Sequence, residues 1–193
     1  MLKLLPDPEL VSNWNEFRTM IQPSLQRALF DYWCSLWRDG TMPARKDIDP
    51  IDIPRLLPHV GLIDVLPGPA FRYRLIGSAM VDTYKTDFTG RELFEAKSGA
   101  YAEALYDMYC DCAASKSPIY SRARFIYPKG VISELADSGL DTQRLLLPLS
   151  ANNHDVDMLL YSMIAVRSDE SMYLQYRVID DSIGFIEDLR VRT

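Results

Sequence analysis

Cysteine and histidine are scarce in this chain of 193 residues, which has three cysteines and two histidines. Three cysteines form no even disulfide framework, and only one residue separates Cys110 from Cys112, where zinc and redox motifs usually have two or more. His59 and His154 have no Glu or Cys at ligand spacing, which argues against a metal site. We therefore expect buried free thiols, surface histidines and no bound metal.

A clustered basic surface is also missing. The chain has 21 Lys and Arg residues against 27 Asp and Glu residues, a formal net charge of -6, and the basic residues are scattered. A nucleic-acid-binding protein needs a clustered basic face to gain affinity from counterion release. We therefore expect no nucleic-acid partner.

Long apolar runs are absent too. No run approaches the roughly 20 residues that a membrane-spanning helix needs. The first seven residues, Met-Leu-Lys-Leu-Leu-Pro-Asp, lack the apolar region and the cleavage site of a signal peptide. We expect a cytoplasmic protein with no membrane partner.

Recognisable catalytic motifs are also lacking. The chain contains no Gly-x-Ser-x-Gly elbow, no phosphate-binding glycine loop and no Ser/His/Asp order. The two histidines lie in a proline-rich segment and in an expected turn, which are unlike settings for a shared site. We expect that the protein is not an enzyme.

The hydrophobic content of 48% is enough for one sizeable core in a chain of this length. We expect one domain with two extensions rather than two independent domains. The expected division is an N-terminal helical arm at residues 1–42, a main domain at 43–166 and a C-terminal extension at 167–193. In that extension, residues 172–178 alternate like an edge strand, and residues 183–189 could form a short helix.

The arm is expected to contain two helices with an unusually broad apolar surface. The first begins at Pro8 and ends before Pro23, and the second begins at Ser24 and stops near Gly40. One contact surface would leave several large side chains of the second helix in water, at a cost of about 1.5–3 kcal/mol for each. We therefore predict a homodimer whose interface contains Leu25, Leu29, Phe30, Trp33 and Trp37.

After the arm the character of the chain changes sharply. Pro43, Pro50, Pro54 and Pro58 remove backbone donors and favour extended geometry, so we expect a stiff, non-helical connector. Strands and short helices then follow. They are expected as a strand at 60–66, a strand from 71 that ends at Gly77, a helical turn at 79–84, a helix that starts at a Thr89–Glu92 capping box, a helix at 100–115, a strand at 118–127, and a hairpin that pairs 144–149 with 158–166.

The connector and this order of elements resemble a family of small bacterial proteins built on the PAS sensor fold. In that family a helix ending in Trp precedes a Pro-Arg-Asp-Ile-Asp-Pro connector, and Trp37, Pro43, Arg45, Asp47, Ile48, Asp49 and Pro50 match it here. Residues 74–79, 87–91 and 145–149 add further matches. The resemblance covers residues 25–166 and implies an α+β fold. That fold is a PAS-like five-stranded antiparallel sheet with short helices over one face, preceded by a helical arm.

The resemblance also indicates where a ligand would bind, because PAS folds bind small molecules between the inner sheet face and the short helices. Relatives that bind haem usually supply a His from the long helix, but residues 100–115 contain none. Light-sensing flavin proteins of this type need a reactive Cys after the short helices, and residues 90–96 contain none. We therefore expect neither haem nor flavin.

Arginine is the remaining indication of a ligand, since several arginines lie on expected strands. A buried guanidinium needs an anionic partner, which a small anionic metabolite would supply. Alternatively, these arginines lie on the wetter face of the sheet and pair with ordinary acidic residues. The candidate ligand-binding residues are Arg74, Tyr84, Arg91, Arg124 and Arg144.

Two functions of different class follow from these expectations. The first is a cytoplasmic signalling module that binds a small molecule or a protein partner; because no kinase, cyclase or DNA-binding segment is recognised, it would act in trans on an unknown effector protein. The second is a structural dimerisation or adaptor module with no ligand, whose pocket is filled by its own aromatic side chains, such as Phe71, Tyr73, Phe125 and Tyr127. The fold alone does not distinguish them.

Overall fold

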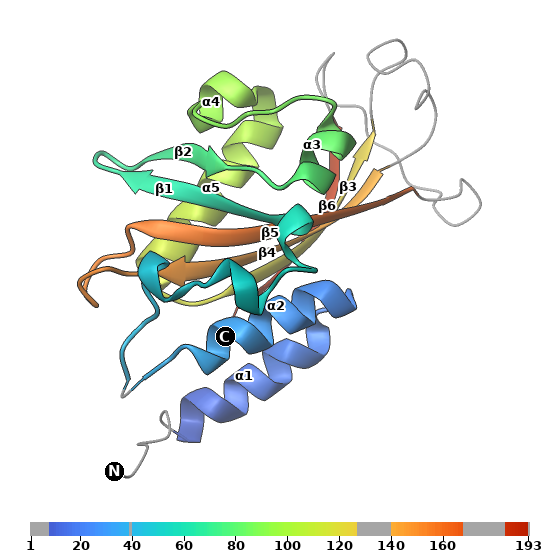
Figure 1. Cartoon of the computed structure of the whole chain (residues 1–193). Helices are drawn as coiled ribbons and strands as arrows, with labels where there is room; N and C mark the ends of the chain where they lie inside the picture. The colour runs from blue at the N-terminus through green and yellow to red at the C-terminus, as the bar shows by residue number, and fades with distance from the viewer. Residues whose placement is uncertain (1–7, 39, 127–139, 168–183, 193) are drawn as a thin grey trace.

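An antiparallel sheet forms the centre of the structure (Figure 1). The computed structural model describes residues 8–38, 40–126, 140–167 and 184–192. The strands lie in the order β2-β1-β5-β4-β3-β6. Their bounds are β1 Val60–Leu66, β2 Ala70–Leu75, β3 Ile119–Ile126, β4 Leu140–Leu149, β5 Met158–Arg167 and β6 Gly184–Arg192. Strands β1 to β5 form the expected five-stranded sheet, and β6 extends it beside β3.

Three helices cover the inner face of the sheet. They are α3 (Ser78–Tyr84), α4 (Leu93–Ala96) and α5 (Gly99–Ser115). One apolar stripe of α5 is buried in a core cluster with the inward side chains of β1, β2, β4 and β5. That stripe consists of Tyr101, Leu105, Met108 and Cys112.

The helical arm covers the opposite face of the sheet (Figure 1). It consists of α1 (Pro8–Met20) and α2 (Ser24–Ser35). Aromatic side chains of both helices form a second core cluster with the outward leucines of β4 and β5. Trp33 is completely buried there, and its indole Nε1–H donates a hydrogen bond to the carbonyl oxygen of Pro148 at 3.0 Å. The sheet therefore separates two cores.

The predicted dimer interface was argued from the broad apolar surface of the second helix, but the chain itself covers that surface. Leu29, Phe30 and Trp33 are buried within the chain, and Leu25 and Trp37 are partly buried against the same cluster. The second contact surface that the apolar girth of α2 requires is supplied by α1 and the sheet of the same chain. These side chains are therefore not free to bind a second copy while the arm is docked, and a homodimer stays a prediction.

The proline-rich connector also differs from the expectation. It contains three short 3-10 turns, η1 (Arg45–Asp47), η2 (Pro50–Asp52) and η3 (Leu57–His59). A proline is tolerated in the first turn of a helix, where its missing N–H would have no intrahelical partner. Pro50 occupies that position in η2, where the Asp49 carboxylate accepts a hydrogen bond from the Ile51 N–H.

The predicted start of the helix that follows Gly90 is wrong. The capping box of α4 consists of Glu92 and Glu95 rather than Thr89 and Glu92, and the Glu95 carboxylate accepts a hydrogen bond from the Glu92 N–H. The Thr89 N–H instead donates to the Asp87 side chain within a turn. The sequence pattern was correct in kind but shifted by one helical turn.

The expected helix at residues 183–189 is also wrong, because residues 184–192 form strand β6. The free edge of β3 supplies backbone partners for these residues, and tertiary pairing overrides a weak local pattern. The alternating segment at 172–178 lies outside the described residues. Within the part of the chain that the structure describes, no helix has the length and apolar character needed to cross a membrane.

Candidate functional site

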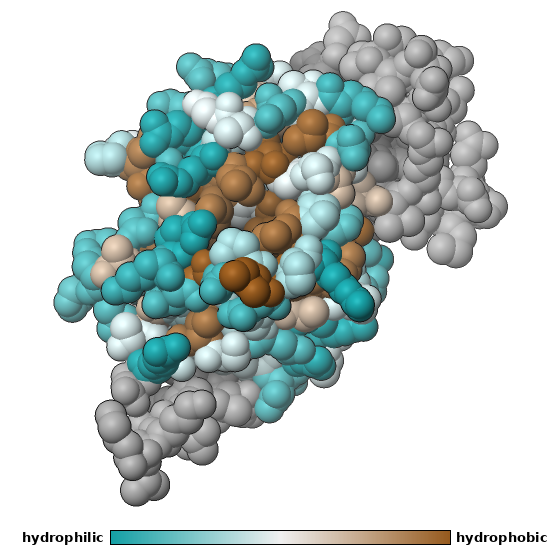
Figure 2. Space-filling view, in the orientation of Figure 1, coloured by the Kyte–Doolittle hydropathy of each residue, from teal (hydrophilic) through white to brown (hydrophobic). Residues whose placement is uncertain are grey.

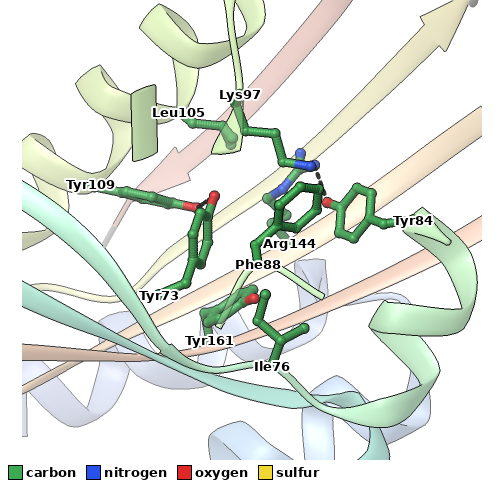
Figure 3. A pocket seen from close by; sticks show the side chains of 9 residues that line it. All are labelled: Tyr73, Ile76, Tyr84, Phe88, Lys97, Leu105, Tyr109, Arg144 and Tyr161. Carbon is green, nitrogen blue, oxygen red and sulfur yellow. Dashed lines mark hydrogen bonds between the residues drawn. The ribbon is translucent and has the colours of Figure 1, made fainter. Parts of the chain in front are cut away.

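A small cavity lies between the inner sheet face and the helices (Figure 3). Its volume is about 10 Å³, which leaves room for about one water molecule. Its walls are mostly aromatic but include two cationic side chains. The lining consists of the rings of Tyr73, Tyr84, Phe88, Tyr109 and Tyr161, the aliphatic Ile76 and Leu105, and the cations Lys97 and Arg144.

Alternate residues of a strand point to opposite faces of the sheet, and this determines which strand residues line the cavity. Tyr73 of β2, Arg144 of β4 and Tyr161 of β5 all lie on the inner face, since their neighbours belong to the arm-side core or face outward. Gly61 of β1 is the cross-strand partner of Tyr161. A Cβ at Gly61 would overlap the Tyr161 ring, so glycine is required for this ring to lie across β1.

Arg144 is the most deeply buried cation, with 2% of its surface exposed. Its guanidinium donates hydrogen bonds to the hydroxyl oxygens of Tyr101 at 2.6 Å, Thr142 at 3.2 Å and Tyr84 at 3.4 Å. Burial lowers the pKa of Arg144, but the phenols of Tyr101 and Tyr84 outweigh this effect and raise it overall. Arg144 is therefore a fixed positive charge on the inner face of the sheet.

Lys97 approaches the cavity from the chain segment between α4 and α5 (Figure 3). Its ammonium nitrogen lies 3.8 Å from the ring centre of Tyr84 and 3.6 Å from that of Phe88, a cation–π arrangement. Burial, together with the nearby charge of Arg144, lowers the pKa of Lys97 to about 8. Lys97 therefore gains or loses its proton easily near physiological pH.

Tyrosine hydroxyls form two contacts around the cavity. The hydroxyls of Tyr73 and Tyr109 lie 3.3 Å apart, as do those of Tyr84 and Tyr101. Burial raises the pKa of Tyr73 well above its ordinary value and that of Tyr109 to about 12. Burial also raises the pKa of Tyr84, but the charges of Arg144 and Lys97 outweigh it and leave this pKa below the ordinary value.

The structure brings two of the five candidate ligand-binding residues to the cavity, Tyr84 and Arg144. Arg74 lies on the opposite face of β2 and pairs with Asp64 at 3.5 Å, as expected for a charge on the wetter face. Arg91 is exposed in the turn that runs along the edge of β2. Arg124 pairs with Asp141 in the register of β3 and β4, but its side chain lies outside the described part of the structure.

Sequence reasoning missed Lys97, Tyr109 and Tyr161, and it named Tyr73 only as an aromatic side chain that could fill the pocket. Lys97 follows a short helix in a segment rich in charge, where a solvated lysine is the usual expectation. Tyr109 is one residue past Met108 on the buried side of α5, so helical periodicity could have placed it near the sheet. No local pattern indicates that these side chains converge.

The thiols and acidic residues offer no second chemical site. All three cysteines are free; Cys112 is buried, and burial raises the pKa of Cys34 to about 12. The described residues contain no group of three or more His, Cys, Asp and Glu side chains that could hold a metal ion. The cavity at Arg144 and Lys97 is therefore the candidate site.

Comparison with known proteins agrees with this geometry. A family model described as a PAS domain matches residues 20–164, which are three quarters of the chain and include every residue that lines the cavity. No curated protein and no solved structure gives a significant match. The matched region runs from the end of α1 through β5, which is the part of the chain that encloses the cavity and carries α2. The chain therefore belongs to the PAS domain family, whose members are typically sensory and signalling modules.

Proposed function

We propose that the protein is a sensory module that binds a small molecule in this cavity and passes the resulting change through its arm to a separate effector protein. The observation that carries the proposal is the cavity itself, where two cations and four tyrosines converge in an otherwise apolar interior. Buried polar groups without a functional reason are costly, and ligand sites typically combine apolar walls with a few convergent polar groups. The small free space favours a small ligand over haem or flavin.

A polar contact gives the cavity a route to the arm. The side-chain amide of Gln26 in α2 is completely buried and donates to the carbonyl oxygens of Gln143 at 2.9 Å and Ser162 at 3.1 Å. Gln143 directly precedes Arg144, and Ser162 directly follows Tyr161. Adjacent residues of β4, and adjacent residues of β5, thus carry a cavity side chain on one face and an attachment of the arm on the other.

A second contact supports the same route. The Tyr120 hydroxyl donates to the Gln143 side-chain oxygen and accepts a hydrogen bond at 3.2 Å from the backbone N–H of Gln22, just before α2. A ligand that shifts Arg144 or Tyr161 would therefore alter backbone atoms that hold the arm. A ligand can change the position of the arm only if it binds more tightly to one arrangement of the arm than to another.

The alternative is a structural adaptor with no ligand. The observation that favours it is the small size of the cavity, which has room for about one water molecule. The hydroxyls of Tyr73 and Tyr109, and those of Tyr84 and Tyr101, also contact one another rather than an empty space. In that case the convergent polar groups satisfy one another and serve only to hold the helices on the sheet.

A thermal-shift screen of small metabolites distinguishes the two functions. We expect at least one compound to raise the melting temperature of the wild-type protein by binding the folded state. The rise should disappear in Leu105→Trp, which fills the cavity, and persist in Arg74→Met, which alters an arginine on the opposite face. Uniformly flat melting temperatures, or a rise that persists in Leu105→Trp, would support the adaptor instead.

A further inference from the structure

The side chains that line the cavity include cations but no carboxylate. Two of the nine side chains that line it are cations, Lys97 and Arg144, and none is a carboxylate. Arg144 is held by hydroxyl oxygens of Tyr101, Thr142 and Tyr84. Among the described residues, Lys97 makes no ion pair, and its recorded contacts are with the faces of aromatic rings. Two like charges beside one desolvated space favour an anion in that space.

The hydroxyl pair of Tyr73 and Tyr109 supplies a hydrogen-bond donor at the other side of the cavity. The hydroxyls of Tyr73 and Tyr109 face one another at 3.3 Å (Figure 3). Two hydroxyls carry two protons, and their mutual hydrogen bond uses one of them. The second proton is free to be donated to an occupant of the cavity. Anions accept such hydrogen bonds, whereas a cationic occupant would have no acceptor of full negative charge among the lining side chains.

The size of the space limits the anion. The cavity has a volume of about 10 Å³, so it has room for a single small ion. A dicarboxylate, a phosphate or a nucleotide would require the aromatic walls to separate. A monovalent anion matches the charge of the site, because Arg144 is permanently charged whereas Lys97 can lose its proton.

We propose that the cavity binds a small monovalent anion, of the size class of a halide or formate, between Lys97 and Arg144 and beside the hydroxyl pair of Tyr73 and Tyr109. This inference rests on the proposed sensory function and names the chemical class of its ligand. Lys97 supplies an adjustable charge and Arg144 a permanent one. The aromatic walls exclude water, which strengthens the attraction between the ion and both cations.

The test compares anions of different size at constant ionic strength. The melting temperature of the wild-type protein is measured across a titration with sodium bromide, with sodium formate and with sodium gluconate, whose anion is too large for the cavity. Lys97→Met removes the charge but keeps an unbranched side chain, and Lys97→Arg keeps the charge. Arg74→Met removes a charge of the same sign from the opposite face and is the matched control.

We expect bromide and formate, relative to gluconate, to raise the melting temperature of wild type and of Arg74→Met by the same amount. The apparent affinity should fall about tenfold or more in Lys97→Met, because a charge-assisted contact is lost, and should be recovered in part in Lys97→Arg. A crystal grown in bromide should then show an anomalous peak between Lys97 and Arg144.

Other outcomes overturn the inference in distinguishable ways. If bromide and formate act equally on wild type and Lys97→Met, the anion effect is a general salt effect and the inference fails. If only neutral compounds stabilise the protein through the cavity, the anion class is wrong while the sensory function stands. If no compound of any charge stabilises it, both fail together.

Discussion

The cavity lowers the pKa of Lys97, which makes the stability of the folded protein depend on pH. The pKa of a free lysine is about 10.4, whereas the buried Lys97 has a pKa of about 8. Between these two values the unfolded chain binds more protons than the folded chain, so this residue makes stability rise with pH. Below the folded pKa, both states are protonated, and the cost of burying the ammonium is fully present.

We therefore predict that wild type gains stability relative to Lys97→Met as the pH is raised from 8 to about 9, where free tyrosines, with a pKa of about 10, are still mostly protonated. Urea unfolding at several pH values measures this difference. The comparison with the variant removes the contributions of groups whose titration does not depend on Lys97. A difference that is constant across this range would show that Lys97 is not desolvated.

Gly61 sets the position of the Tyr161 ring at the base of the cavity. We predict that Gly61→Ala destabilises the protein by about 1–3 kcal/mol, because the added methyl group overlaps a buried ring. In the background Tyr161→Leu, which removes that ring, the same substitution should cost much less. Equal losses in urea unfolding of the two backgrounds would contradict this assignment.

At the scale of elements, one buried amide contributes directly to the attachment of α2 to the central strands. Gln26 donates to two backbone carbonyls, and its Oε1 has no hydrogen-bond partner among the described residues. Gln26→Leu leaves those two carbonyls without their donor, so we predict a loss of about 1–3 kcal/mol in urea unfolding. The exposed Gln22 is the matched control, and Gln22→Leu should change stability by less than about 0.5 kcal/mol.

Should Gln26→Leu be neutral, the amide would not be the attachment point. The lost hydrogen bonds would then be offset by removal of the unpaired Oε1 and by apolar packing. The exposed ion pair between Arg18 and Asp31 also joins α1 to α2, but both side chains are more than 40% exposed. Such pairs contribute at most about 1 kcal/mol, so the aromatic cluster carries most of this attachment.

Most of these elements could be predicted from the sequence because strong local patterns specify them. Strand β1 has the expected bounds, and the helix expected at residues 100–115 is α5. The prediction failed where long-range contacts decide the outcome. Residues 184–192 form a strand because β3 offers an open edge. The apolar surface of α2 is covered by its own chain, so it no longer argues for the homodimer, which stays a prediction.

The candidate site was harder to predict than the fold. Arg144 and Tyr84 were named among the candidates, but the same reasoning named Arg74, which lies on the other face of its strand. Strand alternation shows which residues share a face and leaves open which face is buried. Lys97 comes from a segment between two helices, so only the three-dimensional arrangement brings it to the cavity.

At the scale of the whole molecule, one sheet separates a core that holds the cavity from a core that holds the arm (Figure 1). Figure 2 shows apolar surface across the middle of the face seen in that view. Ile51 in the connector is 82% exposed. Leu57 and Leu75 are also substantially exposed. These residues lie outside the contact between the arm and the sheet.

The arm is needed to keep the outer sheet face from water. We predict that a chain starting at residue 43 aggregates or self-associates, because it exposes leucines that are buried beneath α2 in the full chain. These include Leu145, Leu147 and Leu160. Light scattering measures the outcome, with the full chain as the control. A well-folded, soluble monomer without residues 1–42 would show that the arm is dispensable for covering this face.

Hydrogen–deuterium exchange of the full chain, with and without a saturating ligand of the cavity, tests most directly whether the cavity and the arm are coupled through the central strands. The account predicts that ligand changes the exchange of backbone amides in β4 and β5 and in α2, and that Gln26→Leu removes the change in α2 while the change at the cavity remains. A ligand effect confined to the helices over the cavity, with α2 unchanged in wild type, would contradict it.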